Sequence, residues 1–233
     1  MLDISTVQAI TLDLDDTLWP IWPTIARAEK QLLAWLQVHA PATATLAADP
    51  HCRVVLRAEV EARYPELAHD LGSLRREAIR LQLARAGDDT NLAEPAYDVF
   101  IAERMNVTLF EDVLPALEWL SARMPIVSVS NGNADVHQIG IGNFFAATVT
   151  ARDVGVGKPH ARIFQAAAKA ASVAPQAVLH VGDDAALDVV GALAVGMQTV
   201  WVNRAEHLWT QEQHPHASVA DMLELCDLLG RRG

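Results

Sequence analysis

The stretch AITLDLDDT, residues 9–17, decides the fold, because an apolar run leads here directly into three carboxylates. Its first part, Ala9–Leu14, has the length and the residue types of a core strand. Further runs of this kind are Pro125–Val129, Ala146–Thr150, Ala177–Val181 and Gln198–Val202. Helical patterns alternate with them at Asp112–Ala122, Ala134–Ile141, Ala161–Ala171 and Ala185–Ala194. The alternation predicts an α/β fold, with a parallel sheet that helices cover on both faces.

One interval interrupts this alternation. From about Trp19 to Met105 the patterns are helical, and no segment has a convincing strand pattern. Helices are expected at Ile25–Val38, Arg53–Arg63, Gly72–Ala86 and Leu92–Arg104. We therefore expect an α/β core domain of residues 1–18 and 106–233, interrupted by an all-helical domain of residues 19–105.

Composition restricts the partners. The net charge is −11, from 18 Lys and Arg against 29 Asp and Glu. A nucleic-acid-binding surface needs positive charge, so no nucleic acid partner is expected. Cys52 and Cys226 lack the spacing of a metal site or a disulfide framework. No signal-peptide pattern and no apolar run of about 18 residues is visible, so we expect a cytoplasmic protein that does not bind membranes.

Two carboxylates follow the first strand. Asp13 and Asp15 stand at i and i+2, so their side chains point to the same side of an extended chain. Such a pair repels itself unless a cation lies between, and Mg²⁺ favours a few carboxylates plus water and phosphate. The alternative interpretation is a polar loop, because aspartate is common in turns.

Polar residues also follow the later strands. Ser130 and Asn131 come after the second run, and their hydroxyl and backbone N–H groups suit a phosphoryl group. Lys158 precedes Pro159, which fits the first turn of a helix and would place the lysine at the helix start. Each signal alone also fits a plain turn or a solvated lysine.

A second acidic cluster follows the run Ala177–Val181. It contains Asp183, Asp184 and Asp188, of which the last two also suit the capping of a helix. In a parallel sheet the carboxyl ends of the strands meet at one edge, so all these groups are expected together. They supply a nucleophile, an acid, a metal site and phosphate donors, which is a set for phosphoryl transfer. No glycine-rich nucleotide loop is present, which disfavours a kinase.

The order of these motifs resembles that of the haloacid dehalogenase superfamily. The matching stretches are LDLDDT at 12–17, SNG at 130–132, GKP at 157–159 and VGDDAALD at 181–188. The resemblance implies a Rossmann-like α/β core, and the helical insertion is similar to the C1 cap domain of that superfamily. It further implies a phosphatase that needs Mg²⁺ and acts on a small phosphorylated metabolite.

The resemblance also implies a role for each matching residue. Asp13 would attack phosphorus and form an aspartyl-phosphate, and Asp15 would act as acid and then as base. Mg²⁺ would be held by Asp13, by the backbone carbonyl of Asp15 and by Asp183. The phosphoryl group would be bound by Thr17, Ser130, Asn131 and Lys158. Supporting positions would be Asp184 and Asp188.

A narrower resemblance concerns a bacterial phosphatase subgroup linked to the riboflavin pathway. LDLDDTLWPIWPTI, residues 12–25, and LHVGDDAALDVVGALAVGMQTVWV, residues 179–202, look like that subgroup. The implied substrates are 5-amino-6-(5-phospho-D-ribitylamino)uracil and FMN. The alternatives are a sugar-phosphate or phosphoglycolate phosphatase and a phosphomutase. A 2-haloacid dehalogenase is disfavoured, because dehalogenases of the superfamily lack the aspartate found here at Asp15. The alternative that is not an enzyme is a phosphate-binding signalling module.

Four residues of the helical insertion and its entry are candidates for substrate contacts. Trp19 and Trp22 could stack on a pyrimidine or flavin ring, or else pack in the hinge and cap. Arg75 and Arg76 could meet a phosphate or ribityl hydroxyls, or else form pairs on a solvated helix face. The sequence leaves the oligomeric state open.

Overall fold

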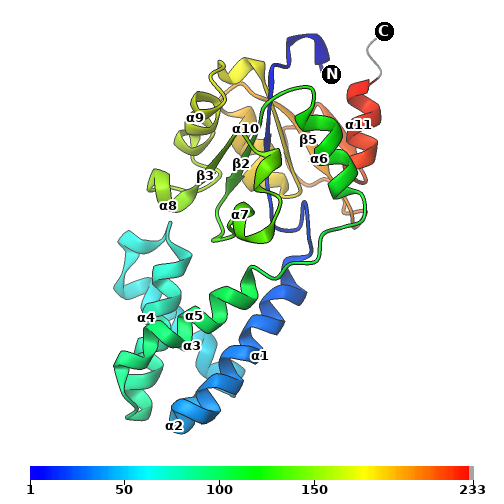
Figure 1. Cartoon of the computed structure of the whole chain (residues 1–233). Helices are drawn as coiled ribbons and strands as arrows, with labels where there is room; N and C mark the ends of the chain where they lie inside the picture. Colours follow the sequence, from blue (N-terminus) through cyan, green and yellow to red (C-terminus); the bar gives the residue numbers. More distant parts are fainter. Residues whose placement is uncertain (231–233) are drawn as a thin grey trace. The chain divides into compact units, whose positions relative to one another are not determined.

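The computed structural model describes residues 1–230, and the chain divides into two compact units (Figure 1). The core unit combines Met1–Pro20 with the chain from Thr108 onwards, and the helical unit spans Ile21–Val107. The chain therefore crosses between the units twice, after Pro20 and after Val107.

The core unit contains a six-stranded parallel sheet with the order β3-β2-β1-β4-β5-β6. The strands are β1 (Ala9–Leu12), β2 (Ile126–Ser130), β3 (Ala147–Thr150), β4 (Val178–Gly182), β5 (Gln198–Val202) and β6 (Ala217–Val219). β1 pairs with β2 through Ile10 and Ile126, and with β4 through Ile10 and Leu179. Because β1, β2, β4 and β5 are buried throughout, they carry apolar runs rather than alternating patterns. The predicted α/β fold class is confirmed.

Helices pack against this sheet (Figure 1). They are α6 (Val113–Ser121), α7 (Val136–Ile139), α8 (Ala151–Val154), α9 (Ala161–Ala170), α10 (Gly191–Leu193) and α11 (Met222–Gly230). α9 packs on β2 and β3 through a buried cluster that includes Val127, Val149, Ile163 and Phe164. α6 pairs with α11.

The structure differs from the sequence-based expectation at three places in the core unit. No element was expected after Arg204, yet this segment forms β6 and α11. The expected helix Ala185–Ala194 begins as a π-helical turn, Ala185–Val190, because Val189 N donates to Asp184 O at 3.2 Å, one residue wider than an α-helical turn. Pro159 does not occupy the first turn of a helix, since α9 begins at Ala161 with His160 as its N-cap. Lys158 consequently lies in the loop before the helix.

The helical unit consists of α1 (Ile21–His39), α2 (Pro41–Ala47), α3 (Pro50–Arg63), α4 (Leu71–Ala86) and α5 (Ala93–Arg104). Its core is built by α1, α2, α4 and α5, with Leu32, Leu36, Ile79, Leu83 and Phe100 buried together. Local chemistry sets the helix ends. Asp70 caps α4 by accepting from Ser73 N at 3.0 Å, and Gly87 ends it with φ 81°. Among the described residues, no helix is long and apolar enough to span a membrane.

Candidate active site

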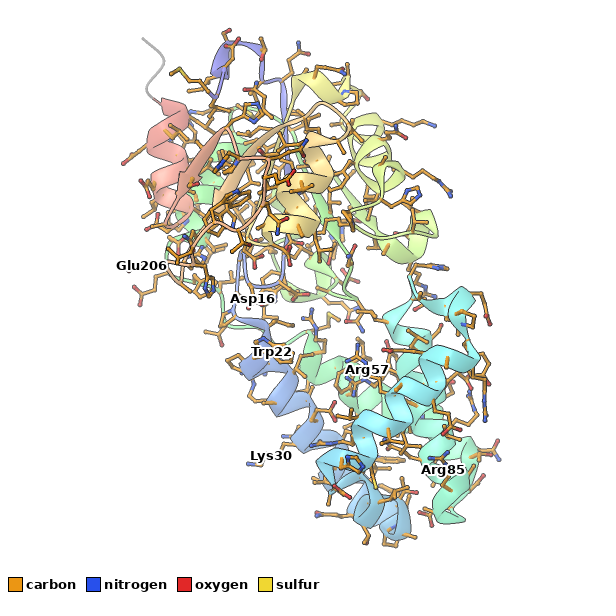
Figure 2. The ribbon with its side chains drawn as sticks, turned by 180° about the vertical axis from the view of Figure 1, so that it is seen from behind. Asp16, Trp22, Lys30, Arg57, Arg85 and Glu206 are labelled. Carbon is orange, nitrogen blue, oxygen red and sulfur yellow. The ribbon has the colours of Figure 1, made fainter. Side chains whose placement is uncertain are left out.

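The carboxyl ends of β1, β2 and β4 bring the expected polar residues together. Asp13 follows β1, Ser130 ends β2, and Asp183 follows β4. Because the three strands are neighbours in register, residues far apart in sequence meet at this edge. Asp16, labelled in Figure 2, lies in the loop that leaves β1 at this edge.

The loop after β1 is a tight turn that presents Thr17 to both acidic loops. Leu18 N donates to Leu14 O at 2.8 Å, and Asp16 has a φ of 60°, which aspartate tolerates better than most residues. The buried hydroxyl of Thr17 donates to Asp183 Oδ1 at 2.9 Å, and Asp13 Oδ2 lies 3.4 Å away. Thr17 therefore links the loop after β1 to the loop after β4.

Lys158 lies between two buried carboxylates. Its ammonium donates to Asp13 Oδ1 and, at 2.6 Å, to Asp188 Oδ1. All three side chains are buried. Burial alone would raise the pKa of Asp188, but the ammonium of Lys158 and the His180 ring hold it well below its usual range. Burial likewise opposes the charge on Lys158, yet the two carboxylates raise its pKa. The lysine is thus a fixed positive charge beside Asp13.

Three carboxylates form a cluster of the size that holds a cation. One oxygen each from Asp13, Asp183 and Asp188 lies within 4.8 Å of the others. Burial and the neighbouring carboxylates raise the pKa of Asp13, and the same causes raise the pKa of Asp183 to about 7. Three carboxylates against one ammonium leave two negative charges uncompensated, which a divalent cation would balance. Oxygen ligands of this kind fit Mg²⁺.

This cluster differs from the expected ligand set in one member. Asp188 stands in it, whereas the carboxylate of Asp15 accepts from the Trp19 indole N–H at 2.8 Å. Participation of Asp15 through its backbone carbonyl stays a prediction. The indole hydrogen bond fixes the orientation of the Asp15 side chain, as an acid–base group needs.

Magnesium is expected to stabilise the protein more strongly as the pH rises through 7. The pKa of Asp183 is higher in the folded protein than in the unfolded chain. Between these two pKa values the unfolded chain has lost the proton and the folded protein still holds it, so the free energy of unfolding falls as the pH rises. Metal-free protein should therefore lose stability over this range, and Mg²⁺ bound to ionised Asp183 should restore it. The measurement is the Tm with Mg²⁺ or with EDTA at about pH 6 and about pH 8. An equal Mg²⁺-dependent shift at both pH values would contradict this.

Asn131 holds the loop that carries Lys158. Its amide oxygen accepts from Lys158 N at 2.6 Å, and its amide nitrogen donates to Lys158 O at 2.9 Å. Gly157 makes room for this clamp, because a Cβ there would stand 2.6 Å from Asn131 Oδ1. Asn131 was expected to bind the phosphoryl group, but both the amide oxygen and the amide nitrogen of its side chain are hydrogen-bonded to the backbone of Lys158. Ser130 is buried, and its hydroxyl accepts from Gly132 N at 2.9 Å.

Replacing Asn131 with alanine is expected to lower kcat by about 10²-fold, since it frees the lysine from its position. The steady-state kinetics of phosphate release would measure this. Gln198→Ala is a matched control at the start of β5. The Gln198 amide likewise accepts from a backbone N–H, Asp3 N at 2.7 Å, and donates to the carbonyl of the same residue at 2.9 Å, with a further bond to Thr6 Oγ1 at 3.0 Å. Equal losses of kcat in the two variants would mean that Asn131 supports the fold and has no specific effect on the position of Lys158.

His180 is a buried site neighbour that sequence reasoning missed. Its Nε2 lies 3.1 Å from Asp188 Oδ1, and its Nδ1 lies 2.8 Å from Thr11 Oγ1. Burial lowers the pKa of this histidine, so the ring is neutral and donates from Nε2 to the carboxylate. Its signal in the sequence was a lone histidine within the apolar strand VLHVG, residues 178–182.

The second acidic loop is held from within. Asp184 Oδ1 accepts from Ala186 N and Leu187 N, both at 2.8 Å, so this residue caps the following turn. Asp184 N in turn donates to Asp188 Oδ2 at 3.0 Å. Gly182 is required beside them, because a Cβ there would collide with the Asp188 side chain. The capping interpretation of Asp184 is therefore confirmed, and its role in supporting the site stays a prediction.

The candidate substrate residues have different surroundings. Trp19 is fully buried, so its ring face is not available for stacking, and the residue packs instead. Trp22, labelled in Figure 2 at the start of α1, is 74% exposed. Arg75 pairs with Glu29 and lies 4.0 Å above the Phe100 ring. Arg76 bonds Glu94 at 3.0 Å and lies 3.8 Å above the Tyr97 ring. Both arginines thus hold the helices of their own unit together.

The parallel sheet and the motifs at its carboxyl edge define a hydrolase of the haloacid dehalogenase-like type. The sequence pattern of this family matches residues 7–196, and the chain belongs to it. The resemblance to the superfamily is therefore confirmed, as is the prediction that the chain is an enzyme. The chain has phosphatase relatives within the family.

Three similar proteins stand out. The chain is 30% identical to the 5-amino-6-(5-phospho-D-ribitylamino)uracil phosphatase YigB of Escherichia coli (strain K12), over 97% of this chain and 98% of that protein. It is 30% identical to a phosphoserine phosphatase of Thermus thermophilus, over 68% of this chain and 66% of that protein. A crystal structure of a 2-haloacid dehalogenase from Pseudomonas syringae pv. Tomato DC3000 superposes with a TM-score of 0.92 at 33% identity, covering 97% of this chain and 100% of that chain.

Proposed function

We propose that the chain is a Mg²⁺-dependent phosphatase, which hydrolyses a small phosphorylated metabolite through an aspartyl-phosphate on Asp13. The observation that carries the proposal is the carboxylate cluster Asp13, Asp183 and Asp188, which leaves two negative charges for a divalent cation to balance. Next to it, Asp15 supplies a second, separately oriented carboxylate. A nucleophile and an acid–base group two residues apart are what phosphate ester hydrolysis needs.

The first half of the reaction uses Asp13 and Asp15. A carboxylate oxygen of Asp13 attacks phosphorus, the bond from phosphorus to the ester oxygen breaks, and Asp15 gives that oxygen a proton. Lys158 neutralises charge on the phosphoryl oxygens, since its ammonium already lies beside Asp13. Ser130 at the end of β2 and Thr17 in the loop after β1 would supply the hydroxyl groups that orient the phosphoryl group.

The second half releases phosphate. Asp15 takes a proton from water, whose oxygen attacks phosphorus and restores the free Asp13 carboxylate. Asp13, Asp183 and Asp188 would hold Mg²⁺, with the backbone carbonyl of Asp15 as the further ligand implied by the family motif. When bound, the cation supplies positive charge to the phosphoryl oxygens. Asp188 also accepts a hydrogen bond from Lys158, so this carboxylate would contact both the ammonium and the cation.

The substrate we propose is 5-amino-6-(5-phospho-D-ribitylamino)uracil or FMN. The support is the 30% identity to a phosphatase of that uracil compound over 98% of its length. The experiment is phosphate release with Mg²⁺ from a panel of these two compounds, phosphoserine, phosphoglycolate and several sugar phosphates. A clear preference for a simple sugar phosphate would overturn the substrate assignment and leave the reaction class intact.

A second candidate function is that of a 2-haloacid dehalogenase, which the similarity to the 33% identical dehalogenase from Pseudomonas syringae favours. In that reaction a carboxylate displaces halide from carbon, and no metal is needed. The carboxylate cluster and Asp15 would then be without use, so the phosphatase is the better fit. Halide release from 2-chloropropionate in the presence of EDTA, without phosphate release from any ester, would reverse this preference.

A further inference from the structure

Two side chains at the end of β5 bind the backbone of two loops of the site, the loop after β1 and the loop after β4. Trp201 Nε1 donates to Asp183 O at 2.7 Å, and Arg204 Nε donates to Thr17 O at 3.0 Å. These two acceptors belong to the residues whose side chains meet through the 2.9 Å hydrogen bond from Thr17 Oγ1 to Asp183 Oδ1. One short segment, residues 201–204, therefore holds the loop after β1 and the loop after β4.

Arg204 is itself rigidly placed. Its two terminal nitrogens bind both oxygens of Asp112, at 3.0 and 2.7 Å, and its guanidinium lies 4.0 Å from the centre of the Phe110 ring. Asp112 Oδ2 also accepts from Met222 N at 2.8 Å. The pair is largely buried, with 16% and 12% of the side chains exposed. A bidentate pair of this kind fixes the orientation of the guanidinium as well as its distance from the carboxylate. A lysine ammonium in its place would leave the orientation free.

The indole of Trp201 is fixed as well. The residue is 6% exposed, and its ring meets the Trp209 ring edge-on at 4.9 Å. Trp201 is part of β5, which pairs with β4 through Trp201 and Gly182, directly before Asp183. The donor to Asp183 thus comes from the rigid interior of the sheet.

The site needs such support because its carboxylates repel one another. Asp13, Asp183 and Asp188 carry more negative charge than Lys158 balances. Their loops would separate unless other contacts held them at the distance that suits a cation. The hydrogen bond of Thr17 with Asp183 joins the loops through side chains, and the donors from β5 hold the backbone behind it.

We propose that Trp201 and Arg204 are positioning residues, which set the separation between Asp183 and the Asp13–Thr17 loop and thereby the affinity of the site for a divalent cation. This inference rests on the metal site of the proposed function. Neither residue touches the reacting atoms. Each one acts through the backbone carbonyl to which it donates. Substituting either residue should therefore weaken cation binding before it affects the chemical step.

The experiment measures Mg²⁺ binding by isothermal titration calorimetry, alongside phosphate release as a function of Mg²⁺ concentration. Trp201→Phe keeps the aromatic ring and removes one hydrogen bond, Arg204→Lys keeps the charge, and Arg204→Met removes both charge and hydrogen bonds. We expect the dissociation constant for Mg²⁺ to rise about tenfold in Trp201→Phe and Arg204→Lys, and further in Arg204→Met. At saturating Mg²⁺ the first two variants should recover most of the wild-type kcat.

The controls use another tryptophan and arginine of the core unit. Arg123 lies 3.8 Å above the Trp119 ring, and both belong to α6 and its end. Trp119→Phe and Arg123→Met should leave Mg²⁺ binding unchanged. If Arg204→Met does not fold, Mg²⁺ binding by Trp201→Phe and Arg204→Lys still tests the inference.

Unchanged Mg²⁺ binding in Trp201→Phe and Arg204→Lys would overturn the inference, as would a loss of kcat that saturating Mg²⁺ does not recover. The binding measurement separates this inference from the proposed function. Wild type that binds Mg²⁺ but hydrolyses no phosphate ester would refute the reaction, while weaker binding in the variants would still support the positioning role. Wild type that binds no divalent cation would refute both.

Discussion

Phosphate release is expected to fall by about four orders of magnitude or more when Asp13 is replaced by asparagine. The amide has nearly the shape of the carboxylate but is not a nucleophile, so no aspartyl-phosphate can form. The variant should remain folded. Asp13 is one of three mutually repelling carboxylates, and burial together with Asp188 and Asp183 already raises its pKa. Removing its charge relieves that repulsion, although Lys158 loses one of its two partners.

The measurement is steady-state phosphate release at saturating Mg²⁺, with circular dichroism to confirm the fold. Asp16→Asn is the matched control, because it removes a carboxylate from the same loop but outside the cluster. Asparagine also tolerates the φ of 60° found at that position. The control should retain most of the activity. Comparable losses in both variants would mean that general disturbance of the loop, and not loss of the nucleophile, is what the assay reports.

Replacing Lys158 with methionine is expected to reduce both stability and catalysis. Asp13 and Asp188 would remain buried without their ammonium, which typically costs about 3–5 kcal/mol of unfolding free energy. Loss of the charge beside the phosphoryl group should lower kcat by about 10²–10³-fold. Lys158→Arg should regain more of the stability than of the activity, because the guanidinium keeps the charge but not the shape of the ammonium.

The stability loss should depend on pH in a defined direction. Asp188 has a lowered pKa, so its contribution is present above the unfolded pKa and is lost as the pH falls through the folded one. Lys158 has a raised pKa, so its contribution is present at neutral pH and is lost only as the pH rises through the folded pKa. Across neutral pH both contributions are present.

Urea unfolding with EDTA present would measure the difference between wild type and Lys158→Met. The difference should be larger at about pH 8 than in acid, where the buried carboxylates of the variant take up protons and no longer need the ammonium. An unfolding free energy of Lys158→Met equal to that of wild type at neutral pH would show that the ion pairs contribute nothing to the fold.

The sequence could predict the sheet because its signals are local. Each buried strand is a short apolar run, and the residue types after β1, β2 and β4 already had the character of a phosphate and metal site. A parallel sheet brings such strand ends to one edge, so Asp13, Ser130 and Asp183 could be placed together without coordinates. β6 was missed because it has three residues and is only partly buried, which gives it no distinct apolar run. α11 could have been predicted, because Met222, Leu225, Cys226 and Leu229 have helical spacing.

What the sequence could not predict are contacts between a side chain and a distant backbone. Asn131 has the look of a turn residue, and nothing near it in sequence shows that its amide holds Lys158, 27 positions away. The bond from Arg204 to Thr17 spans 187 positions. His180 was hidden because a single polar residue in an apolar strand does not disturb the strand pattern. In each case the fold brings the two partners together, and a local sequence pattern holds no information about a partner so far away in the chain.

The most direct test of the central claim is mass spectrometry of acid-quenched enzyme during turnover of a phosphate ester with Mg²⁺. We predict a fraction of the protein heavier by one phosphoryl group, located on the peptide that contains Asp13. The adduct should be missing in EDTA and in Asp13→Asn. Continued turnover of wild type with the adduct on another residue would contradict the account, and so would an adduct that forms from a haloacid but from no phosphate ester.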